Sequence, residues 1–187
     1  TGTDENAFKN VLSARQQGVS TAELGRRNAR LFKRLGEVLQ IDADDFVRTT
    51  EERHGRAVRR LWRQVCPGDL YLQNYRGLYC TGCEDFYLER DLVEGRCPDH
   101  GIVPAQVEER NYFFRLSAYQ DQIAEWIRSQ RVRIEPPQRR REILRFVEDG
   151  LRDISVSRTA ARVQNWGIAV SDDPAQIVYV WIDALIN

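Results

Sequence analysis

The sequence has no methionine, few lysines and histidines, and no excess of charge of either sign. Its 28 Lys and Arg residues balance 28 Asp and Glu residues, so the formal net charge is +0 at pH 7. A chain without net charge has no overall excess of positive charge to attract a nucleic acid, so a polyanion would have to bind a local basic patch. Arginine-rich runs occur at residues 26–30 and 139–141, but most such runs are solvated helix faces. We therefore expect no DNA partner.

Long apolar runs are also absent. Runs such as residues 177–182 are far shorter than the roughly 20 residues of a membrane-spanning helix, and no charged leader with an apolar segment opens the chain. The 42% hydrophobic and 30% charged residues are ordinary for a globular protein. We expect a cytoplasmic location and no membrane partner. Without any methionine, either the initiator has been removed or the sequence is an excerpt.

The most informative pattern that is present is a C-x2-C-x13-C-x2-H array formed by Cys80, Cys83, Cys97 and His100. Three thiolates and one imidazole at this spacing are typical of a closed tetrahedral zinc site. Such a site is structural, because no coordination position stays open for water. The alternative is a disulfide between Cys80 and Cys83 or Cys97, although nothing else in the chain indicates an oxidising compartment. Cys66 is left over as a free thiol.

The first third of the chain is predicted to be helical. Apolar residues at helical spacing predict helices over residues 5–17 and about 20–40, and a third helix that follows Thr49 and runs up to residue 66, after the tail of a strand at residues 1–3. Capping-box pairs, Ser20 with Glu23 and Thr49 with Glu52, predict where the second and third helices start. The dipeptide at residues 67–68, Pro-Gly, ends the third helix.

From residue 69 the sequence predicts short strands, and a metal lobe over about residues 71–111. A strand at 111–116 leaves this lobe, and Ser117 is expected to cap the next helix, which ends at the Pro-Pro pair 136–137. Another helix follows at about 138–148. The run 177–181 is predicted to be a buried strand.

Several collinear blocks of the sequence together resemble the catalytic region of methionyl-tRNA synthetases, which are class I aminoacyl-tRNA synthetases. The resemblance covers essentially the whole chain. The blocks are GTDE (2–5), FVRTT (46–50) with His54, YRGLYC (75–80), CE (83–84), GRCPDH (95–100), EERNYFFRLS (108–117), SVSR (155–158), WGI (166–168) and YVWIDAL (179–185).

The resemblance implies an α/β fold: a Rossmann-type nucleotide-binding fold interrupted by a connective-peptide insertion that bears the zinc knuckle. Residues 1–66 would belong to the Rossmann-type domain, 67–176 to the insertion, and 177–187 to the returning strand of the Rossmann-type sheet. In this family methionine is activated by ATP, with Mg²⁺, to methionyl-adenylate and is then transferred to tRNA(Met). Such catalysis depends on positioning and on stabilising charge at the transferred phosphorus.

The resemblance also assigns site residues. Asp4 matches the acidic residue that pairs with the methionine ammonium, although alone it would equally serve as a helix N-cap. Trp181 matches the aromatic residue that contacts the methionine thioether, although alone it would be a core residue. Arg158 matches an arginine that acts in adenylate formation, and a permanently charged guanidinium suits phosphate oxygens.

The ATP-holding signatures of class I, His-Ile-Gly-His and Lys-Met-Ser-Lys-Ser, need residues that this chain lacks. Its histidines are His54 and His100, and its lysines are Lys9 and Lys33. The family places the first signature before the region that matches residue 1 and the second after residue 187. We therefore expect a central excerpt that is inactive by itself.

Two departures from the family pattern motivate alternatives. The first block usually continues with His-Gly, where this chain has Asn6 and Ala7, and an alanine would strain a turn that needs positive φ. Prolines usually follow the WGI block, where this chain has Ala169 and Ser171. One alternative is a diverged synthetase-like paralogue that makes an aminoacyl-adenylate for another purpose. Another is a zinc-knuckle RNA-binding module with base-stacking tyrosines at 75 and 79.

Overall fold

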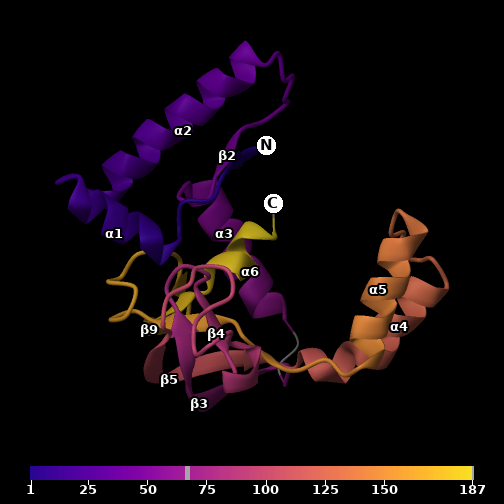
Figure 1. The fold of residues 1–187 in the computed structure, drawn as a ribbon. Coiled ribbons are helices and arrows are strands. Elements are labelled where there is room, and N and C mark those ends of the chain that lie inside the picture. Colours follow the sequence, from indigo (N-terminus) through magenta and orange to yellow (C-terminus); the bar gives the residue numbers. More distant parts are fainter. Residues whose placement is uncertain (66–67, 187) are drawn as a thin grey trace.

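The computed structural model describes residues 1–65 and 68–186. The prediction of a free thiol at Cys66 and the predicted helix end at Pro67 lie outside the described residues. The N-terminal part contains β1 (Gly2–Thr3), α1 (Phe8–Gln16), α2 (Thr21–Val38), β2 (Val47–Arg48) and α3 (Glu52–Gln64) (Figure 1). β1 and β2 pair in parallel, with Gly2 opposite Val47 and Thr3 opposite Arg48. No described helix is long and apolar enough to cross a membrane.

The first helix begins at Phe8 rather than at residue 5. Residues 4–7 lie outside the helix, and two of their side chains have tertiary partners: Glu5 pairs with Arg48, and Asn6 donates to Thr49 O. Ala7 has φ −64° and ψ 137°, so an alanine at this position needs no positive φ and is not strained.

Only one of the two predicted capping boxes forms a cap. Ser20 Oγ accepts a hydrogen bond from Glu23 N at 3.2 Å and starts α2 as predicted. The Thr49 prediction is wrong, because α3 has Glu51 at its N-cap without a side-chain cap. The Thr49 hydroxyl instead accepts from Glu5 N at 2.8 Å. A tertiary partner has replaced the local one.

The middle of the chain forms an antiparallel sheet of β3 (Leu70–Cys80), β4 (Asp85–Tyr87), β5 (Ala105–Phe114) and β6 (Ile154–Ser155), in the order β4-β3-β5-β6. A 3-10 turn, η1 (Glu89–Asp91), follows β4. β3 and β5 pair from Leu70 opposite Phe114 to Tyr79 opposite Ala105, which makes one long hairpin. The metal lobe is carried at the Tyr79–Ala105 end of this hairpin.

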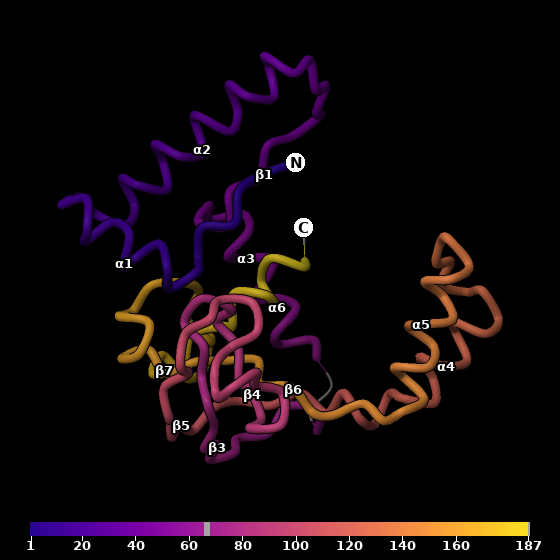
Figure 2. The backbone as a smooth tube through the Cα atoms, viewed as in Figure 1, coloured from indigo at the N-terminus to yellow at the C-terminus, as the bar shows by residue number. Residues whose placement is uncertain are grey.

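A helical hairpin stands away from the sheets (Figure 2). It consists of α4 (Gln120–Arg128) and α5 (Pro137–Glu148), entered through the 3-10 turn η2 (Leu116–Tyr119). Its small core is formed by Ala124, Ile127 and Val147. The prediction that Ser117 caps α4 is wrong: Ser117 lies within η2, where its backbone N–H and its hydroxyl donate to Asp153 Oδ1.

The last part forms a second antiparallel sheet, β7-β9-β8, followed by a short helix. These elements are β7 (Ser157–Thr159), β8 (Ala169–Val170), β9 (Asp173–Val178) and α6 (Val180–Ala184). The predicted strand 177–181 is therefore partly wrong, since an apolar run of this length does not distinguish a buried strand from a helix. Within the described residues β9 pairs with β7 and β8, and the expected place of residues 177–187 in a Rossmann-type sheet stays a prediction.

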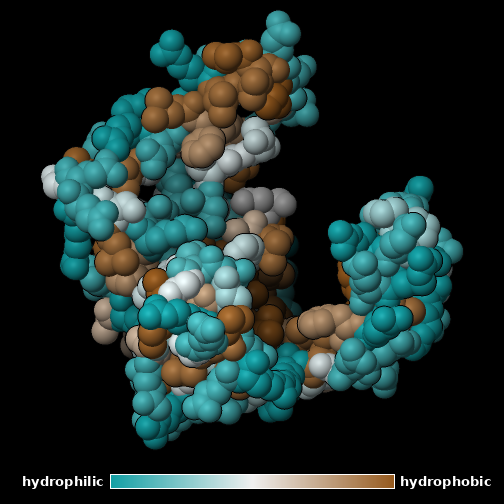
Figure 3. Space-filling model, in the orientation of Figure 1, coloured by the Kyte–Doolittle hydropathy of each residue, from teal (hydrophilic) through white to brown (hydrophobic). Residues whose placement is uncertain are grey.

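The main core joins this sheet to α3. Val58 of α3 packs with Ile168, Val170 and Val178, and Trp62 and Ile182 cover the cluster. By contrast, the predicted apolar stripe on α2 is buried only at Leu24. Beyond it Leu31, Phe32, Leu35 and Val38 are exposed, and Figure 3 shows this apolar surface over the far end of α2.

A buried ion pair holds the extended segment before α1. Glu5, 4% exposed, accepts hydrogen bonds from Arg48 Nε and Nη2, each at 2.8 Å, and from Thr50 Oγ1 at 2.6 Å. Burial alone would raise the pKa of Glu5, but the hydrogen bonds from Arg48, Thr50 and Thr3 outweigh it and hold the pKa below its usual value. The pair therefore stabilises the ionised form.

We expect Glu5→Gln to lower the free energy of unfolding by about 3 kcal/mol, because it leaves Arg48 without its counter-charge. A Glu with a lowered pKa stabilises the fold above its unfolded-state pKa of about 4.5, and this contribution is lost as pH falls through the folded-state pKa. Urea unfolding at pH 7 and in this acid range measures both effects. The matched control is Glu23→Gln in the exposed Glu23–Arg26 pair, where solvent screening makes the expected loss much smaller. Equal losses would contradict the prediction.

Candidate metal centre and amino-acid site

The four residues of the C-x2-C-x13-C-x2-H array converge in space. The Sγ atoms of Cys80, Cys83 and Cys97 and a ring nitrogen of His100 all lie within 4.8 Å of one another. Cys83 Sγ is 3.5 Å from Cys97 Sγ and 3.2 Å from His100 Nδ1, and Cys97 and Cys80 Sγ are 3.8 and 4.0 Å from Nδ1. A tetrahedral zinc ion separates two sulfur ligands by about 3.8 Å and sulfur from nitrogen by about 3.6 Å. The donor set therefore fits zinc in both chemistry and spacing.

Local backbone geometry makes this convergence possible. Cys80 ends β3, and the turn that follows contains Gly82, packed under the His100 ring. A Cβ at Gly82 would lie 2.4 Å from His100 Cδ2, so a side chain at this position would push the imidazole out of place. The three cysteines are free thiols, which contradicts the disulfide alternative.

The thiols are tuned by their neighbours. Burial raises the pKa of Cys97, but hydrogen bonds with His100 outweigh that effect and lower it to about 6. Burial raises the pKa of Cys83 to about 12. Tyr87 Oη lies 3.0 Å from Cys83 Sγ and donates to Asp99 Oδ2 at 3.1 Å, which links the cluster to the acidic surface beside it.

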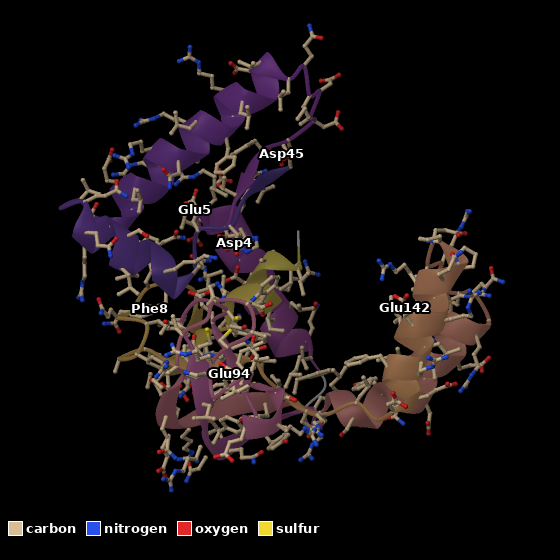
Figure 4. All side chains as sticks on the ribbon, viewed as in Figure 1. Asp4, Glu5, Phe8, Asp45, Glu94 and Glu142 are labelled. Carbon is tan, nitrogen blue, oxygen red and sulfur yellow. The ribbon has the colours of Figure 1, made fainter. Side chains whose placement is uncertain are left out.

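A cavity of about 550 Å³ lies between the N-terminal segment, the metal lobe and α6. Asp4 and Trp181 both line it, although they are near opposite ends of the sequence; Figure 4 shows Asp4 close to α6. The carboxylates of Glu84, Asp85 and Asp99 line the same cavity, together with the metal-cluster residues Cys83 and His100. Among the described residues that line the cavity, Lys9 is the one lysine and there is no arginine. The cavity therefore favours a ligand that carries a positive charge on a small body.

Asp4 and Trp181 are both available to a ligand. Trp181 is 55% exposed, so it is not the core residue that its sequence context alone would suggest. Asp4 Oδ1 accepts a hydrogen bond from Asn6 N at 3.3 Å, and Asp4 does not cap α1, whose N-cap is Ala7. Asp4 is exposed at the cavity, yet the protein around it raises its pKa by desolvation. Their roles in substrate binding stay predictions.

Arg158 is not brought into this cavity. Its side chain is 3% exposed and lies 3.9 Å from the centroid of the Tyr179 ring. Arg158 Nη1 donates to Ser155 Oγ and to Ser157 O, and Nη2 donates to Glu84 O at 3.3 Å. Glu84 lines both the large cavity and a small one of about 20 Å³ that includes Arg158.

Sequence reasoning missed two buried carboxylates beside the site. Glu84, 4% exposed, accepts a hydrogen bond from Lys9 N at 3.0 Å, so the metal lobe caps the first turn of α1 from a distance. Asp183 is 0% exposed and follows Trp181 by two residues. An acidic residue inside an apolar run was the available signal for Asp183, since such a carboxylate is costly to bury without a partner.

Comparisons with known proteins agree with this geometry. The sequence profile described as tRNA synthetases class I (M) matches residues 1–106 and 100–187. The methionine–tRNA ligase of Brucella suis biovar 1 is 43% identical over 192 residues, which cover 100% of this chain and 37% of the ligase. The corresponding ligase of Thermotoga maritima is 41% identical, with 100% of this chain and 30% of the ligase covered.

A solved structure shows the same likeness. Mycobacterium tuberculosis methionyl-tRNA synthetase in complex with methionyl-adenylate superposes with a TM-score of 0.91 at 42% identity, over 100% of this chain and 37% of that one. The chain thus spans well under half the length of the relatives that it matches. Because the family profile matches this chain from residue 1 to residue 187, the chain belongs to the methionyl-tRNA synthetase family of the class I tRNA synthetases.

Proposed function

We propose that this chain is the central part of a methionine–tRNA ligase, which activates methionine with ATP to methionyl-adenylate and transfers it to tRNA(Met). The observation that carries the proposal is the cavity shared by Asp4 and Trp181, in a fold that superposes at a TM-score of 0.91 on a synthetase with methionyl-adenylate. Its volume of about 550 Å³ lies within the range of small-molecule sites.

Each side of the cavity has a chemical role in this proposal. The Asp4 carboxylate pairs with the methionine ammonium, and the surrounding acidic side chains raise the local preference for that cation. The exposed ring of Trp181 contacts the thioether, whose polarisable sulfur gains from an aromatic neighbour. Together they select an amino acid with a soft, unbranched side chain.

Arg158 is proposed to act in adenylate formation. It is always charged, and its Nε–H has no hydrogen-bond partner among the described residues, which leaves one buried donor for a ligand oxygen. Three of its four other N–H donors are held by Ser155, Ser157 and Glu84. A guanidinium fixed in this way stabilises negative charge without reorganising.

Cys80, Cys83, Cys97 and His100 are proposed to hold a structural zinc ion. With four protein ligands, the metal supplies rigidity to the lobe rather than a reactive water. The finer fold assignment is also part of the proposal: a Rossmann-type domain at residues 1–66 and 177–187, and an insertion at 67–176. ATP would enter with Mg²⁺, held by signatures outside this chain, and the location would be cytoplasmic.

The two alternatives fare differently. The RNA-binding module is weakened, because Tyr79 is 3% exposed and Tyr75 packs against Phe86 and Phe113. Neither ring is presented for stacking on a base. The diverged paralogue is still supported by the replacement of the family's His-Gly by Asn6 and Ala7, although the backbone at Ala7 is unstrained. It differs from the main proposal only in the substrate that the full-length enzyme activates.

ATP–pyrophosphate exchange tests the proposal. We expect methionine-dependent exchange from the full-length protein and none from residues 1–187 alone, since neither the two histidines nor the two lysines of this chain stand at the spacing of the ATP signatures. The control is the same assay with the other amino acids. Exchange with a different amino acid would favour the paralogue, and exchange by the isolated chain would contradict the assignment of ATP binding to flanking segments.

A further inference from the structure

A buried polar network connects the two segments that carry Asp4 and Trp181. Asn6, two residues after Asp4, donates from Nδ2 to Asp183 Oδ2 at 3.1 Å and to Thr49 O at 3.2 Å. Asp183 lies two residues after Trp181. Asn6 is 8% exposed and Asp183 is 0% exposed, so water does not compete for this contact.

The third member of the network comes from α3. His54 Nε2 lies 3.6 Å from Asp183 Oδ1, and both side chains are buried. Oδ1 accepts no hydrogen bond from the described residues. Burial raises the pKa of Asp183 to about 8; the Asn6 hydrogen bond opposes this shift, and the nearby Asp4 charge adds to it. Burying the Asp183 carboxyl group at this position therefore lowers the stability of the fold.

Packing alone gives no reason for a carboxyl group here. Its neighbour Ile182 covers the main apolar core, and an apolar side chain of similar size in a buried polar position is often neutral or stabilising. A hydrogen bond adds something that apolar packing does not, namely a fixed direction and distance between two segments. The segments joined here are the two walls of the cavity.

The wall that carries Trp181 needs such an anchor. α6 has only 5 residues, and its N-cap, Tyr179, makes no side-chain cap. The Trp181 ring is 55% exposed, so surrounding side chains do not hold it tightly. The position of the ring depends on where α6 is fixed, and the Asn6–Asp183 hydrogen bond ties α6 to the Asp4 segment.

We propose that Asn6 and Asp183 are positioning residues for the amino-acid site, because their hydrogen bond sets the separation between the Asp4 carboxylate and the Trp181 ring. This inference rests on the proposed function, in which an amino acid spans those two groups. A shift of one wall would misplace the ammonium or the side chain, and misplacement by about 1 Å can cost roughly a hundredfold in rate.

The kinetic test uses the full-length protein in methionine-dependent ATP–pyrophosphate exchange. Asn6→Ala and Asp183→Ala should each raise the methionine KM roughly tenfold or more, with the ATP KM changed by less than about twofold. Asp183→Asn keeps an acceptor for the Asn6 amide and should recover most of the lost affinity. Leu185→Ala, at the C-cap of α6 and 75% exposed, is the matched control and should keep the parent KM.

A purely structural role predicts something else: a lower Tm in Asp183→Ala with an unchanged methionine KM. That result would overturn the inference, as would a failure of Asp183→Asn to recover affinity. Fluorine NMR of protein labelled with 5-fluorotryptophan gives a reading that needs no methionine. The Trp181 signal, assigned from its loss in Trp181→Phe, should shift or broaden in Asn6→Ala and not in Glu23→Gln, whose exposed side chain lies on α2 and does not line the cavity. If the unsubstituted full-length protein shows no exchange with methionine, only the proposed function is contradicted. If the Trp181 signal does not move in Asn6→Ala, only the positioning role is contradicted.

Discussion

Removing zinc from the full-length protein with a chelator should unfold the metal lobe while the rest of the chain stays folded. The protein should contain one zinc ion per chain by elemental analysis. Structural zinc sites in small lobes supply apparent binding free energies of about 10–16 kcal/mol, which become folding free energy because the unfolded lobe has no site. The lobe has little else to hold it, since Val93, Ile102 and Val103 are exposed rather than packed into a core.

The loss should be concentrated between the two long strands. The sequence predicts loss over about residues 71–111, but β3 and β5 pair along ten positions in this range and beyond, and Tyr71 and Phe113 pack on each other across them. We therefore expect hydrogen exchange to rise most strongly over residues 81–104. Glu84 lies in that segment and caps α1, so exchange at the N-terminus of α1 should rise as well.

Substitution of a ligand should reproduce the effect of the chelator. Cys97→Ser removes a thiolate from the cluster, and we expect loss of the metal with the same pattern of exchange. Cys66→Ser is the matched control, because Cys66 stands outside the C-x2-C-x13-C-x2-H array. A zinc-free protein with a protected lobe, or a full complement of zinc in Cys97→Ser, would contradict the assignment.

The metal cluster could be predicted from the sequence because its determinants are local. Two short turns each present two ligands, and Gly82 leaves room for the His100 ring beside the first. The same holds for Ser20, whose hydroxyl caps a backbone N–H three residues away. Patterns of this kind carry their own partner within a few residues, and spacing alone is enough to recognise them.

The failures have the opposite character. Thr49 and Ser117 satisfy local capping patterns, yet each hydroxyl is used by a partner far along the chain, Thr49 by Glu5 and Ser117 by Asp153. The start of α1 is delayed for the same reason. Propensity and spacing are weak priors that tertiary contacts override, and no local pattern identifies a distant partner.

The amino-acid site was only partly predictable from the sequence. Asp4 and Trp181 came from the resemblance, and spacing could not have joined residues at opposite ends of the chain. Asp183 and Glu84 stood inside the matched blocks, but their burial and partners appear only in three dimensions. The residues that contact a ligand were thus easier to predict than those that hold them in place.

Asp4→Asn in the full-length protein should raise the methionine KM roughly 10- to 100-fold, the range expected when a charge-assisted hydrogen bond is lost. The amide keeps the size of the side chain and can still accept from Asn6 N, so the segment should remain in place. What is lost is the negative charge that faces the ammonium. The KM for ATP should change little, because this interaction belongs to the amino acid alone.

The pH dependence of methionine binding separates charge from shape. Desolvation raises the pKa of Asp4, so the carboxylate becomes protonated at a higher pH than an exposed Asp, whose pKa is about 3.8. Methionine affinity should hold above that raised pKa and fall as pH drops through it, since the neutral acid does not attract an ammonium. Glu84 lines the same cavity with a pKa also raised by burial, so part of the acid limb is expected from it.

In Asp4→Asn the part of the low-pH fall in methionine affinity that comes from Asp4 should disappear. The affinity for methionine should be low at every pH and should vary less with pH. The matched control is Asp45→Asn, an exposed carboxylate held by Arg53 outside the cavity, which should keep both the parent KM and its pH profile. Isothermal titration of methionine from pH 4.5 to 7.5 gives the comparison. An Asp4→Asn protein with the parent affinity would mean that the ammonium is bound elsewhere in the cavity, with Glu84, Asp85 and Asp99 as the remaining carboxylates.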